Sequence, residues 1–501
     1  MILWLLLLSL FLVSCAPPEA PPEGFVISGA SVLDGDGGPA RSVSVLVQGD
    51  SIVSIGEDPP AGIDVVDAEG LTLAPGFVDT HSHGDYNLTS HRDALAAVSQ
   101  GITTIVGGQD GGSPYPLAEY FAELEASPAA VNIAAFAGHG RLRREVMGDD
   151  FRRPATDEEI ESMRQFLIAE LEAGALGLGT GLEYDPGIYS ETSEIVTLAR
   201  EAASSGGRYI SHIRSEDRYF WDAVEEIVTV GREANLPVQI SHVKLAMTSS
   251  WGQADRLIAR LDEARAEGVD ITADIYPYPY WQSTLTVMFP ERNFDDTVAA
   301  EFAVTEISTP EGMLIPVYKP ELSYAGKTLA EIAEMRGTEP AQTLIDLIRD
   351  AEAMKAAGEE NVESVIATSM DEGDIAKLMA WEHTNIGTDG ALDGAHPRGY
   401  GTYPRVLGRY VRERDVLTLP QAVQKSTSLA AEHMGFEDRG RIAPGFKADL
   451  VLFDPETVID RATPQDPHAV SIGIESVWVN GVLVYADGNT TGVYPGRVLR
   501  R

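Results

Sequence analysis

The sequence predicts a TIM (β/α)8 barrel flanked by a small β-sandwich domain that is built from both chain ends. In the middle of the chain, about 76–440, eight short apolar runs alternate with helical stretches that carry charged faces. This alternation is typical of parallel βα units. The flanking segments, 25–75 and 441–501, instead contain short β-type runs broken by glycine turns, so we expect the two ends to pair in one β domain.

The eight apolar runs are the expected barrel strands. Functional side chains of a TIM barrel lie at the C-terminal ends of its strands, so polar residues that end these runs are the candidates for a site. Every run carries His, Asp, Glu or Tyr at or near its end, which strand stability does not require. The runs are 76–83, 103–111, 132–140, 174–184, 208–213, 237–244, 269–278 and 384–392.

A segment of about 287–383, between the seventh and eighth runs, is too long for a single barrel loop. It contains two helical patterns, at 327–337 and 341–358. Because insertions next to a barrel mouth often form a lid or a rim, we expect this one to border the site and to influence which substrate fits.

The first residues resemble an export signal. Residues 2–14 form an apolar run that is too short to span a bilayer comfortably and that suits a signal-peptide core. The run ends at Leu12-Val13-Ser14-Cys15, which resembles a bacterial lipoprotein signal. We therefore predict a signal peptide over 1–15, a Pro-rich tether over 16–24, and an exported bacterial protein that is lipid-anchored at the periplasmic side of a membrane. An ordinary secretory signal is the alternative.

Composition limits the partners and the ligands. The net charge of −40 argues against nucleic acid, which needs a basic footprint. An apolar content of 44% is ample for a large core. Cys15 is the only cysteine, which excludes an internal disulfide and a thiolate metal ligand in the mature domain. Nothing in the sequence specifies an oligomeric state.

A metal site is indicated where the apolar runs end. His81 and His83 end the first run, and alternate side chains of a strand share a face, so both imidazoles can bind one ion from the same side. Imidazole and carboxylate ligands without thiolate suit one or two zinc ions, with manganese, cobalt or iron as alternatives. Further candidate ligands end later runs: Glu183, His212, His242 and Asp389.

The order His-x-His, then His, His and Asp on later strands resembles the amidohydrolase superfamily of metal-dependent hydrolases. The finer resemblance is to its N-acyl-D-amino-acid deacylase (D-aminoacylase) family, and it extends from about residue 25 to the end of the chain. The motifs that carry it are GFVDTHSHGD (76–85), GHGRLRREVMG (138–148), TGLEYDPG (180–187), HIRSE (212–216), ISHVK (240–244), YPY (276–278), GTDG (387–390), HPRGYGTYPRVLGRYVRE (396–413) and RGRIAPGFKADLVLFDP (439–455).

The resemblance implies roles for single residues. Asp389 matches the family's catalytic aspartate, and Ser283 is a weak match to a serine that assists. His139, at the end of the third run, is a candidate hydrogen-bond donor to the oxyanion, or else a histidine that orients a loop. The metal-site histidines are matched by His81, His83, His212 and His242, and the residues that hold the substrate carboxylate by Lys244, Tyr278 and Arg398.

The chain departs from the family at one ligand. The family's type members place a metal-ligating cysteine in a Gly-Asn-Cys-Gly turn after the second strand, where this chain has Gly108-Gln109-Asp110-Gly111. Asp110 or Glu183 must then replace the cysteine. We expect Glu183 to bridge the metal ions, because it ends the fourth run, and Asp110 to be a weaker ligand or a supporting group.

The predicted function is a metal-dependent hydrolase of N-acyl amino acids, of the D series by resemblance. A metal-bound hydroxide attacks the amide carbonyl, and Asp389 transfers the proton to the leaving amine. The partner is a small N-acyl amino acid, and membrane contact occurs only through the lipid anchor. The alternatives are a cyclic-amide or dipeptide hydrolase of the dihydroorotase, hydantoinase or isoaspartyl-dipeptidase type, and a non-catalytic surface lipoprotein that kept the fold.

Overall fold

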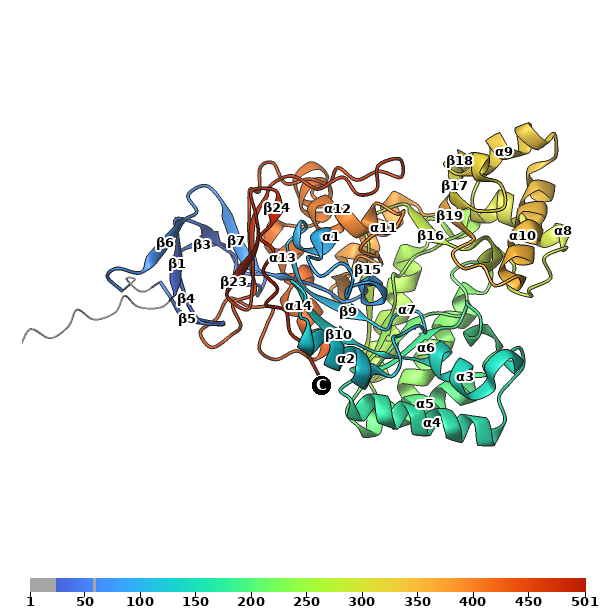
Figure 1. Ribbon diagram of the computed structural model, residues 1–501, viewed down its shortest axis with the longest axis horizontal. Helices are drawn as coiled ribbons and strands as arrows, with labels where there is room; N and C mark the ends of the chain where they lie inside the picture. Colours follow the sequence, from blue (N-terminus) through green and yellow to red (C-terminus); the bar gives the residue numbers. More distant parts are fainter. Residues whose placement is uncertain (1–23, 57–59) are drawn as a thin grey trace, which may run out of the picture.

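The computed structural model describes residues 24–56 and 60–501. The predicted signal peptide, 1–15, and all of the predicted tether except Gly24 lie outside these residues. Figure 1 shows three parts along the long axis, with a β-sandwich at one end, an insertion at the other and a barrel between them. Within the described ranges, no helix combines the length and the apolar character that a membrane crossing needs.

The predicted TIM barrel is confirmed. Its strands run parallel in the order β8-β9-β10 and then β11-β12-β13-β14-β15-β20, and a bridge between Ser82 and Gly390 joins the first strand position to the last. The third expected run is interrupted at Phe136, which separates β10 from β11. The strands are β8 (Phe77–Asp79), β9 (Ile102–Gly107), β10 (Asn132–Ala135), β11 (Ala137–Gly138), β12 (Gly177–Gly181), β13 (Arg208–His212), β14 (Val238–Ile240), β15 (Ile271–Ile275) and β20 (Thr384–Ile386).

Helices connect the barrel strands. In α4, Thr156 caps the N-terminus and Glu159 completes a capping box, while Leu167 and Leu171 are buried. Its acidic first turn and buried leucines match the helical stretches with charged faces that we expected between the apolar runs. The helices of the barrel region are α1 (Leu95–Val98), α2 (Leu117–Ala126), α3 (His139–Met147), α4 (Asp157–Glu172), α5 (Thr192–Ser204), α6 (Phe220–Ala234), α7 (Ala254–Ala266), α11 (Glu372–Ala380), α12 (Arg398–Arg405), α13 (Leu419–Ser426) and α14 (Ser428–Met434).

The two chain ends form the predicted β-sandwich. One sheet has the order β5-β4-β1-β6, and the other has β24-β23-β22-β21-β7-β2-β3, in which β21 pairs antiparallel with β7. Ile27 and Val47 of the first sheet pack against Leu73 and Leu450 of the second in one apolar cluster. The strands are β1 (Phe25–Ser28), β2 (Ser31–Val32), β3 (Arg41–Ser42), β4 (Val45–Gln48), β5 (Ser51–Ile55), β6 (Asp64–Asp67), β7 (Thr72–Pro75), β21 (Leu450–Phe453), β22 (Ile474–Val479), β23 (Val482–Ala486) and β24 (Asn489–Thr490).

The insertion leaves the barrel after β15 and forms its own antiparallel sheet, in the order β16-β19-β17-β18, with three helices beside it. The predicted segment, about 287–383, lies largely within this excursion. Helix α11 is the last helix of the predicted segment. It contacts α7, β15 and β20, so it belongs to the barrel wall. The inserted elements are β16 (Tyr280–Ser283), α8 (Thr297–Phe302), β17 (Met313–Tyr318), β18 (Lys327–Thr328), α9 (Leu329–Arg336), α10 (Pro340–Ala356) and β19 (Glu363–Thr368).

Candidate functional site

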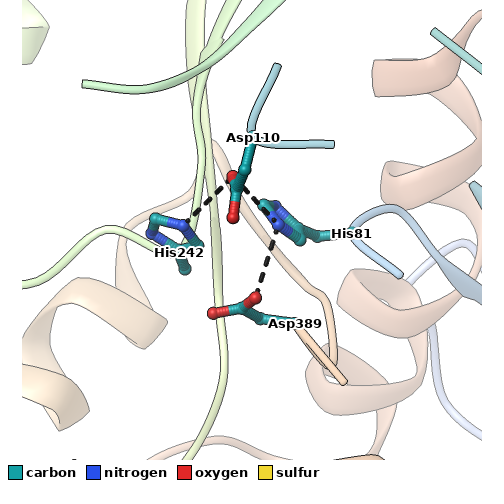
Figure 2. A group of neighbouring side chains, drawn as sticks. All are labelled: His81, Asp110, His242 and Asp389. Atoms are coloured by element: carbon teal, nitrogen blue, oxygen red, sulfur yellow. Dashed lines mark ion pairs between the residues drawn. The ribbon is translucent and has the colours of Figure 1, made fainter. Parts of the chain in front are cut away.

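Buried histidines and carboxylates meet where the barrel strands end. His81, Asp110, His242 and Asp389 each offer one ligand atom, and these atoms lie within 4.8 Å of one another. Figure 2 shows Asp110 between the two histidines. Its Oδ1 lies 3.4 Å from His81 Nε2 and 3.5 Å from His242 Nε2. Asp389 approaches from the other side, with Oδ1 3.5 Å from His81 Nε2.

His83 joins this group from its outer side. Its Nε2 lies 3.1 Å from Asp389 Oδ1 and 3.4 Å from Asp110 Oδ2. The His83 side chain is 24% exposed, whereas that of His81 is fully buried. The two imidazoles therefore reach the same pair of carboxylates, as the His-x-His spacing predicts. We refer to His81, His83, Asp110, His242 and Asp389 as the ligand group.

Asp110 is held in place by an unusual turn. Its φ is 53°, in the left-handed region, and the glycines on its flanks, Gly108 and Gly111, also have positive φ. A Cβ at Gly108 would lie 2.0 Å from the Phe136 carbonyl oxygen, so no other residue fits there. His242 and Asp389 also have positive φ, at 36° and 50°. Such conformations cost about 1–3 kcal/mol each and concentrate at functional sites, which supports a functional role for this group.

The group fits a metal ion. Both ring nitrogens of His81 and Oδ1 of Asp110 are buried, and among the described residues none of these atoms has a hydrogen-bond partner. A buried polar atom without a partner costs about 1–3 kcal/mol. Imidazole nitrogens and carboxylate oxygens that converge on one point are the donors that zinc accepts. A divalent cation would satisfy His81 Nε2 and Asp110 Oδ1 together, whereas His81 Nδ1 points towards Asp274, 3.6 Å away.

Two further buried carboxylates, to which the sequence analysis assigned no role, support the ligand group. Asp274 Oδ1 accepts a hydrogen bond from the His242 backbone N–H at 2.7 Å and lies 3.6 Å from His81 Nδ1. Asp79 accepts from the backbone N–H and the hydroxyl of Thr388, at 2.8 and 2.6 Å. Burial raises the pKa of Asp79 to about 7. Asp79 and Asp274 both stand inside apolar runs of the sequence. That position could have identified them, because a buried carboxylate needs polar partners.

Glu183 does not take the position expected of it. Strand β12 ends at Gly181, and Glu183 lies beside His212, with Oε2 2.9 Å from His212 Nε2. Burial raises its pKa to about 7. His212 in turn reaches the ligand group through His242, whose Nε2 lies 3.1 Å from His212 Nδ1. The structure thus places Asp110, rather than Glu183, between the histidines, because the turn after β9 directs Asp110 inward.

A second cluster of possible ligands, His212, Glu216 and His242, is occupied by a lysine. Lys244 Nζ lies 2.5 Å from Glu216 Oε1 and 2.8 Å from His242 Nδ1. Burial favours the neutral form of Glu216, but Lys244, His212 and His242 together outweigh burial and lower the pKa of that carboxyl. Glu216 therefore positions Lys244. The sequence analysis included Glu216 in a motif but assigned it no role.

The predicted carboxylate-binding residues lie beside a narrow cavity of about 40 Å³. Lys244, Arg398 and Ser283 line it. Arg398 Nη1 lies 2.6 Å from Asp389 Oδ2, and its guanidinium lies over the Tyr276 ring at 4.7 Å. The remaining walls include Ala246, Trp281, Val287, Met288 and Ile307.

Two predicted residues are placed differently from what we expected. The Tyr278 hydroxyl donates to Asp460 Oδ2 at 3.2 Å, so Tyr276 of the same motif is the tyrosine that accompanies Arg398. His139 begins α3 and lies with Nε2 2.8 Å from Glu194 Oε1. This contact joins α3 to α5, and the two roles that we considered for His139 stay predictions. Neither position could be read from the spacing of residues along the chain.

A family model described as "Amidohydrolase family" matches residues 64–485. The chain belongs to the amidohydrolase family. This member is 40% identical to an N-acyl-D-glutamate deacylase of Alcaligenes xylosoxydans xylosoxydans over 95% of this chain and 96% of that protein.

Two solved structures resemble this amidohydrolase, both with a TM-score of 0.85, 35% identity, and coverage of 96% of this chain and 100% of theirs. One is a D-aminoacylase studied for its binuclear metal centre. The other is an N-acyl-D-glutamate deacylase of Bordetella bronchiseptica in complex with zinc and a phosphonate inhibitor that mimics the tetrahedral intermediate. The amidohydrolase therefore lies in the D-aminoacylase branch, as its motifs predict.

Proposed function

We propose that this amidohydrolase cleaves the amide bond of N-acyl-D-amino acids and uses zinc. The observation that carries the proposal is the ligand group, buried next to a cavity with two cationic side chains, Lys244 and Arg398. A zinc ion held by the ligand group supplies a Lewis acid and an activated water at neutral pH. The cations provide donors for the free carboxylate that an acyl amino acid carries and a simple amide lacks.

Asp389 moves the proton. Burial favours the protonated form of Asp389, but Arg398 and the neighbouring histidines together outweigh burial and lower the pKa of that carboxyl below its ordinary value. The carboxylate is therefore ionised and lies next to both His81 and His83, at the ligand end of the cavity. It can accept a proton from the attacking water and deliver it to the leaving amine.

Arg398 and Lys244 hold the amino-acid carboxylate. Lys244 is fixed by Glu216, and Arg398 is fixed by Asp389 and the Tyr276 ring. Among the residues that the structure describes, Nε of Arg398 has no hydrogen-bond partner, so this group can donate to a ligand. When these side chains bind the carboxylate of the substrate, its amide bond lies at the ligand group.

Asp110 replaces the cysteine that type members of the family use as a metal ligand. It contacts His81, His83 and His242 at 3.4–3.5 Å, so it would hold a metal ion together with these histidines. A carboxylate offers two oxygens for this purpose and suits zinc and harder divalent metals. We therefore assign Glu183 to orienting His212.

The test combines metal analysis with a substrate panel. Purified protein is assayed for bound zinc and for hydrolysis of N-acetyl-D- and N-acetyl-L-amino acids, a hydantoin and a dihydropyrimidine. The proposal expects zinc and cleavage of the D series. Cleavage of the cyclic amides alone would favour the hydantoinase or dihydroorotase alternative, and protein that binds no metal and cleaves nothing would favour a non-catalytic lipoprotein.

We also infer that the chain is exported and anchored through a lipid on Cys15. The support is the apolar run over 2–14 followed by Leu12-Val13-Ser14-Cys15. The wild-type protein is then expected in the membrane fraction and Cys15→Ser in the soluble fraction or unprocessed. Equal membrane retention of the two forms would contradict the anchor.

A further inference from the structure

A second cavity, of about 360 Å³, borders the ligand group. His83 and Asp110 line it, whereas His242 and Asp389 line the narrow cavity that holds Lys244 and Arg398. Tyr184 lines both cavities and so lies where they meet. The ligand group is therefore open to two cavities of very different size.

The two cavities correspond to the two halves of an amide substrate. When the carboxylate of the amino acid is bound by Lys244 and Arg398, the amino-acid half fills the narrow cavity of about 40 Å³. The carbonyl carbon then lies at the ligand group, and the acyl chain continues past His83 and Asp110 into the larger cavity. An acetyl group would leave most of about 360 Å³ empty. The cavity therefore has room for a longer acyl group.

The walls of this larger cavity, which we call the acyl-side cavity, carry both polar and apolar groups. Two arginines of α3, Arg141 and Arg144, line it, together with Tyr86 and Ser113. Five of the lining residues are glycines, which leave backbone exposed to the cavity: Gly111, Gly112, Gly140, Gly181 and Gly187. Apolar acyl chains prefer walls of aliphatic side chains. Among the described residues that line this cavity, Pro186 is the one aliphatic residue, beside the aromatic Tyr86 and Tyr184.

The two arginines retain capacity to bind an anion. Arg141 pairs with Glu145 at the surface, at 2.6 Å, while its Nε is buried without a hydrogen-bond partner in the part of the chain that the structure describes. Arg144 donates to the carbonyl oxygen of Asp185 at 3.2 Å. The Asp185 carboxylate on the same wall is already paired with Arg292, at 2.8 Å. Guanidinium groups bind carboxylates with charge-assisted, often bidentate hydrogen bonds.

We propose that the acyl-side cavity binds the acyl half of the substrate and selects an acyl group that ends in a carboxylate, such as succinyl. Arg141 and Arg144 bind the terminal carboxylate. The inference rests on the proposed function, because it requires the amide to be cleaved at the ligand group. It adds the acyl chain as a second determinant of specificity, separate from the amino-acid side.

The test compares three derivatives of one D-amino acid: N-acetyl, N-succinyl and N-succinamoyl. The last two have the same length and differ in one charge. For the wild type, we expect kcat/KM for the succinyl derivative to exceed that for the succinamoyl derivative by about tenfold or more, the usual value of a hydrogen bond to a charged group. The double variant Arg141→Gln/Arg144→Gln should bring this ratio close to one.

Arg200→Gln is the matched control, because Arg200 is not among the residues that line the acyl-side cavity and pairs at the surface with Glu233, at 3.1 Å. It should keep the wild-type ratio. The inference is overturned if the wild type does not prefer the succinyl derivative, or if the double variant keeps the preference. Cleavage of none of the three compounds would instead contradict the proposed function, so the two failures are distinguishable.

Discussion

The barrel mouth and the β-sandwich bury opposite kinds of side chain. In the sandwich, Ile27, Val47 and Leu450 meet in an apolar cluster. At the mouth, His81 and Asp274 are buried just as completely, at 0% and 1% exposure. Apolar burial stabilises a fold, whereas burial of a titratable group costs free energy unless it is paired or coordinates a metal. The side chains buried in the sandwich therefore stabilise the fold, whereas those buried at the barrel mouth serve the function.

The backbone shows the same contrast. In the sandwich, Asn480 has a φ of 49° and is followed by Gly481, in the turn between β22 and β23. Asn-Gly is the preferred sequence of a tight hairpin, so this turn follows local rules. At the mouth, Asp110, His242 and Asp389 have positive φ with no hairpin to require it. The backbone strain at these three residues brings the ligand group together, as is common at functional sites.

The largest expected effect is that of metal removal. Exhaustive chelation should abolish hydrolysis of an N-acetyl-D-amino acid, and zinc should restore it, because the ligand group has no other cation to position water. The circular dichroism spectrum should change little, since the sandwich and barrel cores are apolar. Full activity in protein shown to be metal-free would exclude the proposed chemistry.

Asp389→Asn should come next, with kcat reduced by about 10²–10⁴-fold, the usual contribution of a general acid–base group. The variant should keep much of its zinc, because the histidines and Asp110 remain. The measurements are kcat and metal content on the same preparation. A variant with near-normal kcat would remove Asp389 from the proton transfer.

Asp110→Asn and Glu183→Gln separate the two carboxylates. The geometry predicts that Asp110→Asn loses zinc affinity by the larger factor, while Glu183→Gln loses about 10–100-fold, as expected for a residue that orients a ligand. Competition with a chelator measures both affinities. If Glu183→Gln lost more zinc affinity than Asp110→Asn, Glu183 would be the more important metal ligand, as the sequence analysis expected.

Leu450→Ala tests the other region. Leu450 is fully buried in the sandwich cluster, so the substitution should lower the free energy of unfolding by about 2–5 kcal/mol. At a temperature where the variant is folded, kcat should stay near the wild-type value, because the sandwich contributes no residue to the ligand group. A large loss of kcat in folded protein would show that the two regions are coupled.

Arg398→Ala should have the smallest effect and act mainly through KM, because His81, His83 and His242 remain beside Asp389 and also favour its ionised form. Loss of a hydrogen bond to a charged group is worth about 1.5–3 kcal/mol, and KM rises when ground state and transition state lose it alike. The defect should shrink on an N-acyl amine, the decarboxylated analogue, because the arginine then has no partner to lose. Equal defects on both compounds would mean that Arg398 does not bind the carboxylate.

Much of the fold and part of the site could be predicted from local patterns. The apolar runs of the barrel, the paired chain ends and helix α4 follow from periodicity and capping, which act over a few residues. The shared face of His81 and His83 follows from the two-residue period of a strand. The motifs, as a set, identified the family before any contact was known.

What the sequence determined by itself was therefore the barrel, the sandwich and the residue types that end each strand. Only the tertiary structure decided which of those residues meet. Asp110 rather than Glu183 lies among the histidines, and Tyr276 rather than Tyr278 lies under Arg398. His139 is bound to Glu194. The reason is physical: after a strand ends, a turn with positive φ or a helix start sets the direction of a side chain, and its partner comes from an element far away in the chain.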